Sequence, residues 1–551
     1  MSAESHDARL LSAPIGPQVI TRWARLSLQH RCAGCSASRI SLAFCGRALL
    51  VRRQSSSFEG DRNVVARFRI PKFGDRAPRG NKVGVGFDFG TSNSAVAVFD
   101  GQRVTVVSLE DSGFVMPSAT YIDRAFRAEV GQRAILEYIE RNRGRRVEFR
   151  AEVLGEARVS TGQDDERSGL PTTADTFTLY GKEVDDFGLP GRLFYGIKRL
   201  LADEDNERIA VFGKPMRLVA LMTPILEKMR RRVAGALRSE SLSLQDIDRG
   251  CLGHPVQFEG GGTRKDTLAL ARVSEAYRHA GIVRQGFCPE PIAAAIGYLS
   301  EIGGERPRRI LTVDFGGGTL DLCIVRCEES GVEVESVHGL GLGGNLIDQT
   351  VVRELILPLL GKGERWRRRV DGRDVDTSFP FMKYEQLLLH WQVTYLLNQN
   401  KYTTPIIERK TVGDEGARKF ERLYQLITQN LSFELFQAVK KAKESLSVDP
   451  VVRIDIPEID IDVTLERAEF EAMISGPLET FDQAVQKVLD DAGLGPSDVN
   501  VVLRTGGSAL IPAFTEILER RFPGKVVQYD PFTGVASGLA VADYYGIGNQ
   551  P

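Results

Sequence analysis

The sequence lacks several features that would place it in a specialised class of protein. No uninterrupted apolar run reaches about 18 residues, the length that suggests a membrane-spanning helix. The 72 basic and 73 acidic residues leave a formal net charge of -1, so the chain as a whole does not attract nucleic acid. The seven cysteines are scattered and do not form a disulfide framework. We therefore expect a globular, cytoplasmic protein with neither a membrane nor a nucleic-acid partner.

Acidic residues are missing from Ala8 to Phe58, a stretch with eight arginines and no lysine. This composition resembles an organelle transit peptide, although a stretch translated upstream of the true start would look the same. The pair Cys32 and Cys35 has no second Cys or His pair at zinc-ligand spacing, so it does not predict a metal site. We expect residues 1–80 to be an Arg-rich extension that is disordered or not native, with organelle targeting as the alternative.

The sequence also lacks the GxxxxGK[ST] motif of Walker-type NTPases, but it contains a different glycine-rich turn. Residues 310–322 read ILTVDFGGGTLDL, an apolar strand that leads into Asp314, Gly316–Gly318, Thr319 and Asp321. A buried strand gains nothing from three consecutive glycines, which cost backbone entropy and pack nothing. Glycines do let backbone N–H groups approach an anion closely, so the segment predicts a phosphate-binding turn.

A second turn of the same design lies 226 residues earlier. Residues 82–100 read KVGVGFDFGTSNSAVAVFD, with Asp88 at a strand end and Gly90, Thr91 and Ser92 in the turn. Two such hairpins at domain-scale separation indicate a duplicated architecture with two facing lobes. An aspartate at each strand end suits Mg²⁺ held through water, with a polyphosphate gripped from both sides. The alternative is a pair of ordinary glycine turns with acidic turn formers.

A third segment, residues 499–512, reads VNVVLRTGGSALIP and carries Gly506, Gly507 and Ser508 between a strand and a helix. Such a turn can receive a nucleoside closely, because N–H groups at the helix start are available. In this order the three segments resemble the first phosphate, second phosphate and adenosine motifs of the seventy-kilodalton heat-shock (DnaK-type) chaperones, which belong to the actin-like ATPase superfamily.

Further segments resemble the same family. They are GIKRLL at 196–201 with Lys198, PEPIAAAIGY at 289–298 with Glu290, LGGNLID at 342–348 with Gly343 and Gly344, and VKKAKESLS at 439–447 with Lys443 and Ser447. The resemblance covers about Lys82 to Gly546. It implies an α/β, two-lobed actin-like ATPase (ribonuclease H-like) fold, with duplicated α/β lobes around a nucleotide cleft and a mixed five-stranded sheet in each lobe.

The resemblance also implies a domain layout. We expect a first lobe at 82–305 with a small subdomain at about 121–218, a second lobe at 306–532 with a helical subdomain at about 344–460, and a C-terminal helix at 533–551 that returns to the first lobe. The chain resembles the short YegD-like branch of the family, so we expect no peptide-binding domain. Its function would be that of a slow Mg-dependent ATPase acting as a chaperone-like or nucleotide-gated switch, with protein clients or co-chaperones as partners.

The implied cofactors are ATP or ADP and Mg²⁺, the metal held by Asp88 and Asp314. The residues expected to contact the nucleotide are Gly90, Thr91, Ser92, Gly316, Gly317, Gly318, Thr319, Gly343, Gly344, Lys443, Ser447, Gly506, Gly507 and Ser508. The expected catalytic residues are Lys198, Asp321, Glu290 and Thr319. Lys198 would offset charge on the γ-phosphate and orient the water, while Asp321 or Glu290 would take or relay its proton. Such catalysis works mainly by positioning and charge stabilisation.

The base side of the resemblance departs from the family pattern. The family usually has an arginine where Glu444 follows Lys443, and another where Leu510 follows the Gly-Gly-Ser turn. Phe532 and Thr533 stand where acids are usual. We therefore expect phosphate and Mg²⁺ to bind and leave base selectivity open.

Three other functions have some support in the sequence. Gly339, Gly341 and Gly344 form a GxGxxG, but residues 351–367 read as a helix and a basic loop where a Rossmann unit would place an acid after a second strand. Hydride transfer is therefore disfavoured. A small-molecule kinase would use the same two turns, but the segments around Lys198 and Glu290 argue against it. A nucleotide-gated scaffold without hydrolysis stays open because the base contacts are altered.

Overall fold

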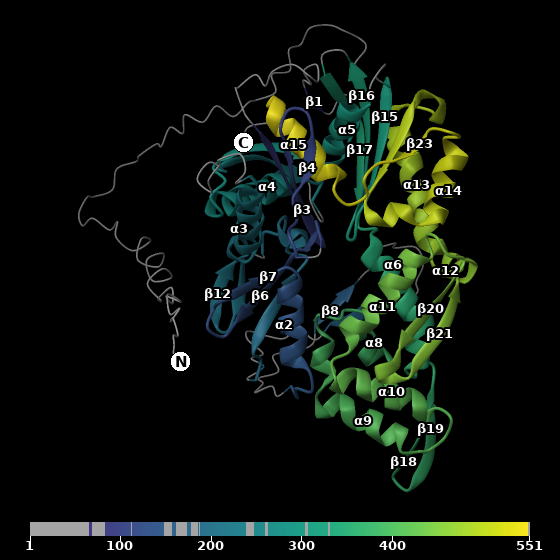
Figure 1. Cartoon of the computed structure of the whole chain (residues 1–551). Helices are drawn as coiled ribbons and strands as arrows, with labels where there is room; N and C mark the ends of the chain where they lie inside the picture. The colour runs from purple at the N-terminus through teal and green to yellow at the C-terminus, as the bar shows by residue number, and fades with distance from the viewer. Residues whose placement is uncertain are drawn as a thin grey trace, which may run out of the picture. The chain divides into compact units, whose positions relative to one another are not determined.

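The computed structural model describes most of the chain beyond the N-terminal region. The described residues are 66–68, 83–111, 113–147, 157–160, 174–177, 186, 188–205, 207–237, 247–258, 263–302, 307–328 and 331–548. The chain divides into two units, 1–60 and 61–551, and all described residues belong to the second. Cys32, Cys35 and most of the Arg-rich extension therefore lie outside the described residues. Figure 1 labels the elements of the described part.

The first sheet is built around a hairpin that ends in the first predicted turn. Its strands are β2 (Gly84–Phe89), β3 (Asn93–Phe99), β4 (Val104–Val106), β5 (Met116–Pro117), β13 (Arg249–His254) and β14 (Arg284–Pro289). They lie in the order β14-β13-β2-β3-β4, with β5 beside β3. Strands β2 and β3 are antiparallel, whereas β13 runs parallel to both β2 and β14.

The second sheet repeats this arrangement around the second predicted turn. Its order is β1 (Ala66–Phe68), β17 (Gly331–Leu340), β16 (Leu320–Glu328), β15 (Arg309–Phe315), β22 (Val501–Thr505) and β23 (Val526–Gln528). Strands β15 and β16 form the antiparallel hairpin, and β22 runs parallel to β15 and β23. The same hairpin with a parallel strand beside it thus occurs twice, which confirms the predicted duplicated α/β fold.

Two details differ from the sequence-based expectation. Each sheet has six strands where five were expected, because β5 is added to the first sheet and β1 to the second. Strand β1 comes from residues 66–68, within the segment that we had placed outside the fold. It pairs antiparallel with β17. Two- and three-residue strands carry almost no periodic pattern, so only their backbone pairing reveals them.

Two helices lie between the sheets and hold them together. Helix α15 (Gly534–Tyr545) packs on β2, β3 and β13, while α5 (Glu290–Glu301) packs on β15 and β16. The two helices also pack closely on each other at Gly297 and Gly538: a Cβ on Gly538 would lie 1.7 Å from the Ala293 carbonyl oxygen, and one on Gly297 would lie 3.3 Å from Gly538 Cα. This layer forms a largely alanine and valine core with Cys251, Cys288 and Cys323.

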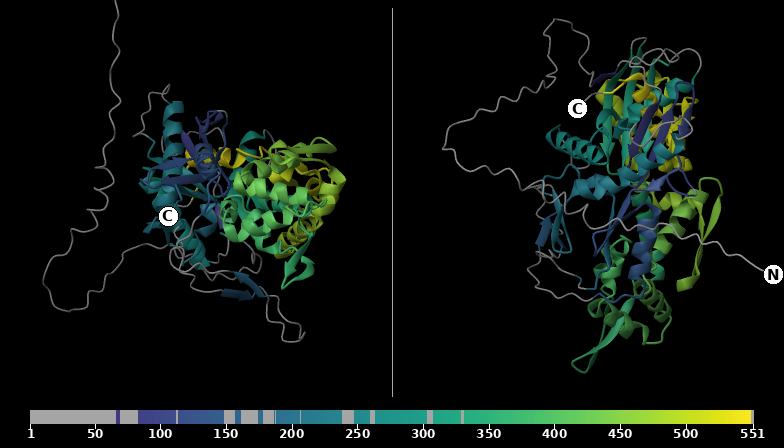
Figure 2. Two further views of the ribbon diagram at one scale, coloured as in Figure 1. Left: turned by 90° about the horizontal axis from the view of Figure 1, so that it is seen from below. Right: turned by 60° about the vertical axis from the view of Figure 1, so that its left-hand side comes forward.

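Other helices cover the remaining face of each sheet. Helices α3 (Leu218–Ala236) and α4 (Thr263–His279) share the apolar core of the first sheet. Helices α13 (Ser475–Ala492) and α14 (Pro512–Arg521) share that of the second. The view from below in Figure 2 shows the elements of the first sheet, coloured purple to teal, beside helices and strands of the second lobe, coloured green to yellow. Within the described residues, no helix combines the length and apolar character needed to cross a membrane.

A small group of elements extends the first lobe. It contains a three-stranded sheet of β6 (Ala119–Asp123), β7 (Ala128–Val130) and β10 (Gly191–Tyr195), covered by α2 (Gln132–Asn142). The short 3-10 helix η1 (Ile197–Leu200) follows β10. Two hairpins come from the same part of the sequence, β8 (Ala157–Ser160) with β9 (Ala174–Phe177) and β11 (Arg208–Val211) with β12 (Lys214–Arg217).

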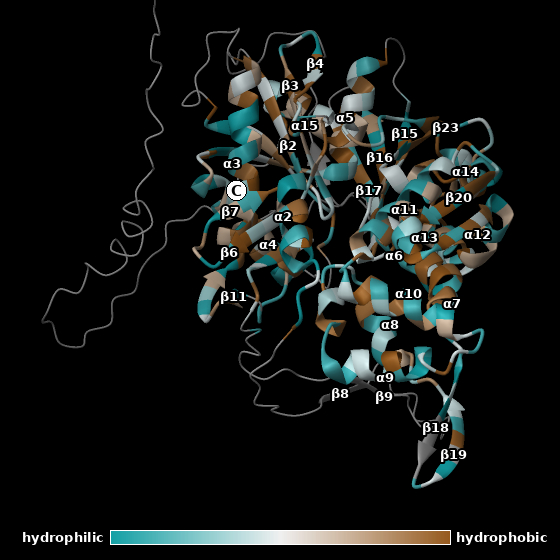
Figure 3. Cartoon of the chain, turned by 60° about the horizontal axis from the view of Figure 1, so that its bottom comes forward, coloured by the Kyte–Doolittle hydropathy of each residue, from teal (hydrophilic) through white to brown (hydrophobic). Residues whose placement is uncertain are grey.

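The second lobe is extended mainly by helices. They are α6 (Gly344–Val351), α7 (Leu357–Leu359), α8 (Met382–Leu388), α9 (Asn400–Lys410), α10 (Ala417–Thr428), α11 (Ser432–Ser445) and α12 (Arg467–Met473). Two hairpins accompany them, β18 (Arg365–Val370) with β19 (Arg373–Ser378) and β20 (Val451–Ile456) with β21 (Ile461–Glu466). Figure 3 shows the β18–β19 hairpin projecting beyond α9.

Candidate functional site

A cavity of about 460 Å³ lies where the turns of the two sheets meet. Asp88 and Asp314, the acids at the two strand ends, both line it. All but two of the predicted site residues line this cavity; the exceptions are Gly343 and Asp321. The structure therefore brings together residues that are up to 420 positions apart in the sequence, from Asp88 to Ser508.

The two glycine-rich turns touch each other at the edge of this cavity. A Cβ on Gly317 would lie 2.7 Å from Ser92 Oγ, and one on Gly318 would lie 3.0 Å from Thr91 Cγ2. A Cβ on Gly316 would meet nothing closer than the Thr319 carbonyl oxygen at 3.8 Å. Side chains at Gly317 and Gly318 would therefore press on the first turn, whereas the space beside Gly316 is open to a ligand.

Gly343 lies beneath the second turn and not in the cavity wall. A Cβ on Gly343 would lie 2.5 Å from the Gly317 carbonyl oxygen. The first N–H groups of α6 are used in the same contact: Gly344 donates to the Gly316 carbonyl at 3.1 Å, and Asn345 donates to that of Gly317 at 2.8 Å. Gly343 would therefore shape the phosphate turn without touching the nucleotide.

The third predicted turn is joined to the second by a side-chain hydrogen bond. Ser508 Oγ donates to the Gly316 carbonyl oxygen at 2.9 Å. Gly506 has a positive φ of 82°, and a Cβ there would lie 2.3 Å from the Phe315 carbonyl oxygen. The close packing against Phe315 explains why this position needs glycine. The two turns form one continuous wall of the cavity.

A buried ion pair crosses the floor of the cavity. Lys198 Nζ lies 2.5 Å from Glu290 Oε1, and both side chains are almost fully buried. Lys198 comes from η1, which follows Gly196 in the left-handed region, and Glu290 opens α5. Burial acts to lower the pKa of Lys198, but the carboxylates of Glu290 and Asp88 outweigh it and raise that pKa. Lys198 is therefore a permanent cation at neutral pH.

The carboxyl groups around this lysine outnumber it. Burial, together with the Glu290 carboxylate, raises the pKa of Asp88 to about 7. The same two causes raise the pKa of Asp321 to about 7 and that of Asp314 well above its ordinary value. These carboxyl groups therefore hold protons near neutral pH that a bound divalent cation would displace, because the cation would favour their charged forms.

This donor set fits magnesium, with one restriction. Carboxylate oxygens are the ligands that Mg²⁺ prefers, and it usually keeps several of its waters when it binds beside phosphates. Among the described residues no three His, Cys, Asp or Glu side chains are grouped closely enough to hold a metal ion by themselves. Asp88 and Asp314 would therefore hold the ion through water and substrate oxygens, not as a closed protein cage.

Asp321 lies behind the cavity wall. Thr319 Oγ1 donates to Asp321 Oδ2 at 2.9 Å, and the carboxylate is 3% exposed. Thr319 itself lines the cavity. The Thr319 hydroxyl therefore links the Asp321 carboxylate to the cavity.

The residues at the site that the sequence analysis missed include Asp348 and Asn345. Lys443 is paired with Asp348, its Nζ 2.6 Å from Asp348 Oδ1, and both side chains are buried. Asn345 Nδ2 donates to Ser92 Oγ at 3.1 Å, which links α6 to the first turn. Asp348 lies one helical turn after Gly344, and that i, i+4 spacing is the signal that could have placed it on the same face.

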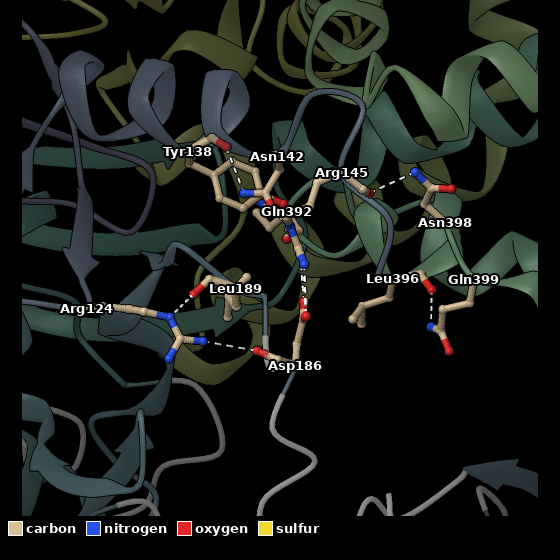
Figure 4. A network of polar contacts seen from close by, with 10 residues as sticks. All are labelled: Arg124, Tyr138, Asn142, Arg145, Asp186, Leu189, Gln392, Leu396, Asn398 and Gln399. Atoms are coloured by element: carbon tan, nitrogen blue, oxygen red, sulfur yellow. Dashed lines mark hydrogen bonds and ion pairs between the residues drawn. The ribbon is translucent and has the colours of Figure 1, made fainter. Parts of the chain in front are cut away.

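A second set of contacts joins the two lobes beside the cavity, shown in Figure 4. Tyr138 Oη donates to the Gln392 carbonyl at 2.7 Å, and Asn398 Nδ2 donates to the Arg145 carbonyl at 2.8 Å. Arg145 in turn forms an ion pair with Asp186 at 2.6 Å. We call the contacts of Tyr138 and Arg145 with residues 391–398 the lobe bridge.

Trp391 is the apolar centre of the lobe bridge. Its ring centroid lies 6.1 Å from that of Tyr138, 5.8 Å from that of Tyr195 and 4.9 Å from that of Phe433. Trp391, Tyr195 and Phe433 also line the cavity. The lobe bridge therefore closes one side of the predicted nucleotide site, a role that nothing in the sequence pattern indicated.

Comparison with known proteins agrees with this geometry. The family model described as Hsp70 protein matches residues 208–362 and 420–544, together just over half of the chain. These segments contain Glu290, the second turn and the Gly506–Ser508 turn. The chaperone protein DnaK 3 of Synechococcus sp. is 24% identical over 462 residues, or 83% of this chain, and the match covers 57% of that relative's length. The predicted resemblance is thus confirmed, and the chain belongs to the Hsp70 family.

Proposed function

We propose that this chain binds Mg-ATP in the cavity between its two glycine-rich turns and hydrolyses it slowly. The observation that carries the proposal is the shared cavity, in which Asp88 and Asp314 lie around one buried lysine. Gly90, Thr91 and Ser92 would hold one side of the triphosphate. Gly316, Gly317, Gly318 and Thr319 would hold the other.

The remaining roles follow from the chemistry of the residues in the cavity. Magnesium, when bound, supplies positive charge that offsets the phosphate oxygens and the surrounding carboxylates. Lys198, held by Glu290, would face the charge that develops on the γ-phosphate and orient the attacking water. Thr319 would relay the proton of that water to Asp321, whose raised pKa favours accepting it near neutral pH.

The proposal is tested by calorimetry with ATP, ADP and GTP, each with and without Mg²⁺. Tight binding that requires the metal is expected for the wild-type chain. Asp88→Asn should reduce the contribution of the metal and leave the metal-free affinity largely unchanged. Equal affinity with and without Mg²⁺ in the wild-type chain would show that the acids serve another purpose.

A nucleotide-binding scaffold without hydrolysis is the second candidate. The close Lys198–Glu290 pair favours it, because an ammonium already paired with a carboxylate has less charge to offer a phosphate. In that case ATP and ADP would set how tightly the lobes close, and a protein client or co-chaperone would bind one degree of closure more tightly than the other. A single-turnover assay separates the two candidates, since only the first releases phosphate.

A further inference from the structure

A half-exposed aromatic ring lies in the wall of the cavity. Phe532 lines the cavity, yet its side chain is 50% exposed. Val448, which also lines it, is 81% exposed. Apolar side chains that gather at a cavity and stay open to solvent mark a surface that is covered when a ligand binds.

The ring of Phe532 is held in one place by its surroundings. A Cβ on Gly507 would lie 2.9 Å from Phe532 Cε1, so the ring lies directly over the Gly507 backbone. The side chain of Asp530 accepts hydrogen bonds from the Phe532 and Thr533 N–H groups, both at 2.9 Å. This Asx turn fixes the backbone from which the ring projects. The backbone that carries Phe532 is therefore fixed, and the ring packs over Gly507.

The position of this surface relative to the phosphate turn is also defined. Gly507 precedes Ser508, whose hydroxyl donates to the Gly316 carbonyl of the second turn. Helix α11 supplies Glu444 to the same cavity, the turn after it supplies Ser447 and Val448, and Leu510 adds a further apolar group. A ligand with its phosphates at Gly316 would thus extend past Ser508 toward the ring of Phe532.

We propose that Phe532 is the stacking surface for the heteroaromatic base of the bound nucleotide. The inference rests on the proposed function, because it assumes that the phosphates occupy the glycine-rich turns. A flat, half-exposed ring offers a base its π-face, and such stacking is favourable for every base because each has a π-face of its own. Leu510 and Val448 offer apolar contact beside it.

The test compares Phe532→Ala and Phe532→Tyr with the wild-type chain by calorimetry. Two probes are used, Mg-ATP and Mg-tripolyphosphate, and the second carries phosphates but no base. Phe532→Ala should weaken Mg-ATP binding about tenfold, a typical loss for one base–aromatic stack. Phe532→Tyr keeps the flat ring and should stay within about twofold of the wild type. Tripolyphosphate should bind all three chains equally.

Phe114→Ala is the matched control. Phe114 is 56% exposed, and it lines a neighbouring groove together with Phe532 but not the cavity itself. Its replacement should leave both affinities unchanged. Equal Mg-ATP affinity in Phe532→Ala and the wild type would overturn the stacking role alone. Failure of both probes to bind the wild-type chain would overturn the proposed function and the stacking role together.

Discussion

The ammonium of Lys198 lies 2.5 Å from the carboxylate of Glu290, although 92 positions separate them in the chain. The pair is buried beneath a cavity that Asp88 and Asp314 enter from the ends of two different sheets. Removal of either charge would leave the other buried without its ion-pair partner. The pair is therefore the point at which the chemistry of the cavity is most sensitive to substitution.

Lys198→Ala should abolish most hydrolysis and spare nucleotide binding. Loss of a positioned charge costs about 1.4 kcal/mol or more of transition-state stabilisation, so we expect a fall of about tenfold or greater in single-turnover phosphate release. Lys487→Ala is a suitable control, because Lys487 forms an exposed ion pair with Asp491 and does not line the cavity. Unchanged turnover in Lys198→Ala would rule out the proposed role of Lys198.

The glycines of the second turn should separate into two classes when each is replaced by alanine. Gly317→Ala drives a Cβ to 2.7 Å from Ser92 Oγ, so it should lower the melting temperature of the nucleotide-free chain. Gly316→Ala meets nothing closer than 3.8 Å and should change the free energy of unfolding by no more than about 0.5 kcal/mol. It should still weaken Mg-ATP binding, because its Cβ occupies space beside the phosphates. Equal destabilisation by both substitutions would contradict this separation.

The nucleotide-free chain should lose stability as the pH rises from about 4 to above 7. Burial and Glu290 raise the pKa of Asp321 to about 7 from an ordinary value of 3.8, so the folded state keeps a proton that the unfolded state has released. Stability is then greatest below the unfolded pKa and falls until the pH passes the folded pKa. The full effect is on the order of 4 kcal/mol for this one group.

Asp321→Asn tests that assignment by chemical denaturation at pH 5 and pH 8. The wild-type free energy of unfolding should decrease from pH 5 to pH 8, and the decrease should be smaller in Asp321→Asn. Asp111→Asn serves as the control, because the Asp111 side chain is fully exposed. A fall of the same size in Asp321→Asn and the wild type would show that other groups cause it.

Weakening the lobe bridge should speed the release of nucleotide. Trp391→Ala removes the ring that packs between Tyr138, Tyr195 and Phe433, so the lobes should part more readily. We expect the rate of release of a fluorescent ATP analogue to rise about tenfold, which corresponds to about 1.4 kcal/mol of lost closure energy. Trp391→Phe retains an aromatic contact, so its release rate should lie between those of the wild type and Trp391→Ala. An unchanged rate in Trp391→Ala would show that release does not require the lobe bridge to open.

Much of the site could be predicted because its signals are local. Each strand-acid-glycine-threonine segment can be recognised within about a dozen residues, and the repetition of the segment 226 positions apart indicated two similar halves. The family resemblance then named Lys198 and Glu290 from short segments. The lobe bridge and the Asp348–Lys443 pair carry no such signal, since each joins segments whose meeting depends on how the lobes pack.

The sequence by itself determined the two acid-tipped turns, the order of the motifs and the membership of the Hsp70 family, because turn chemistry and apolar periodicity are properties of neighbouring residues. Only the tertiary structure decided which glycines meet the opposite lobe and which face the cavity, why Asp321 lies behind Thr319, and where Phe532 points. These are contacts between segments far apart in the chain, and their distances exist only once both sheets have packed on α5 and α15.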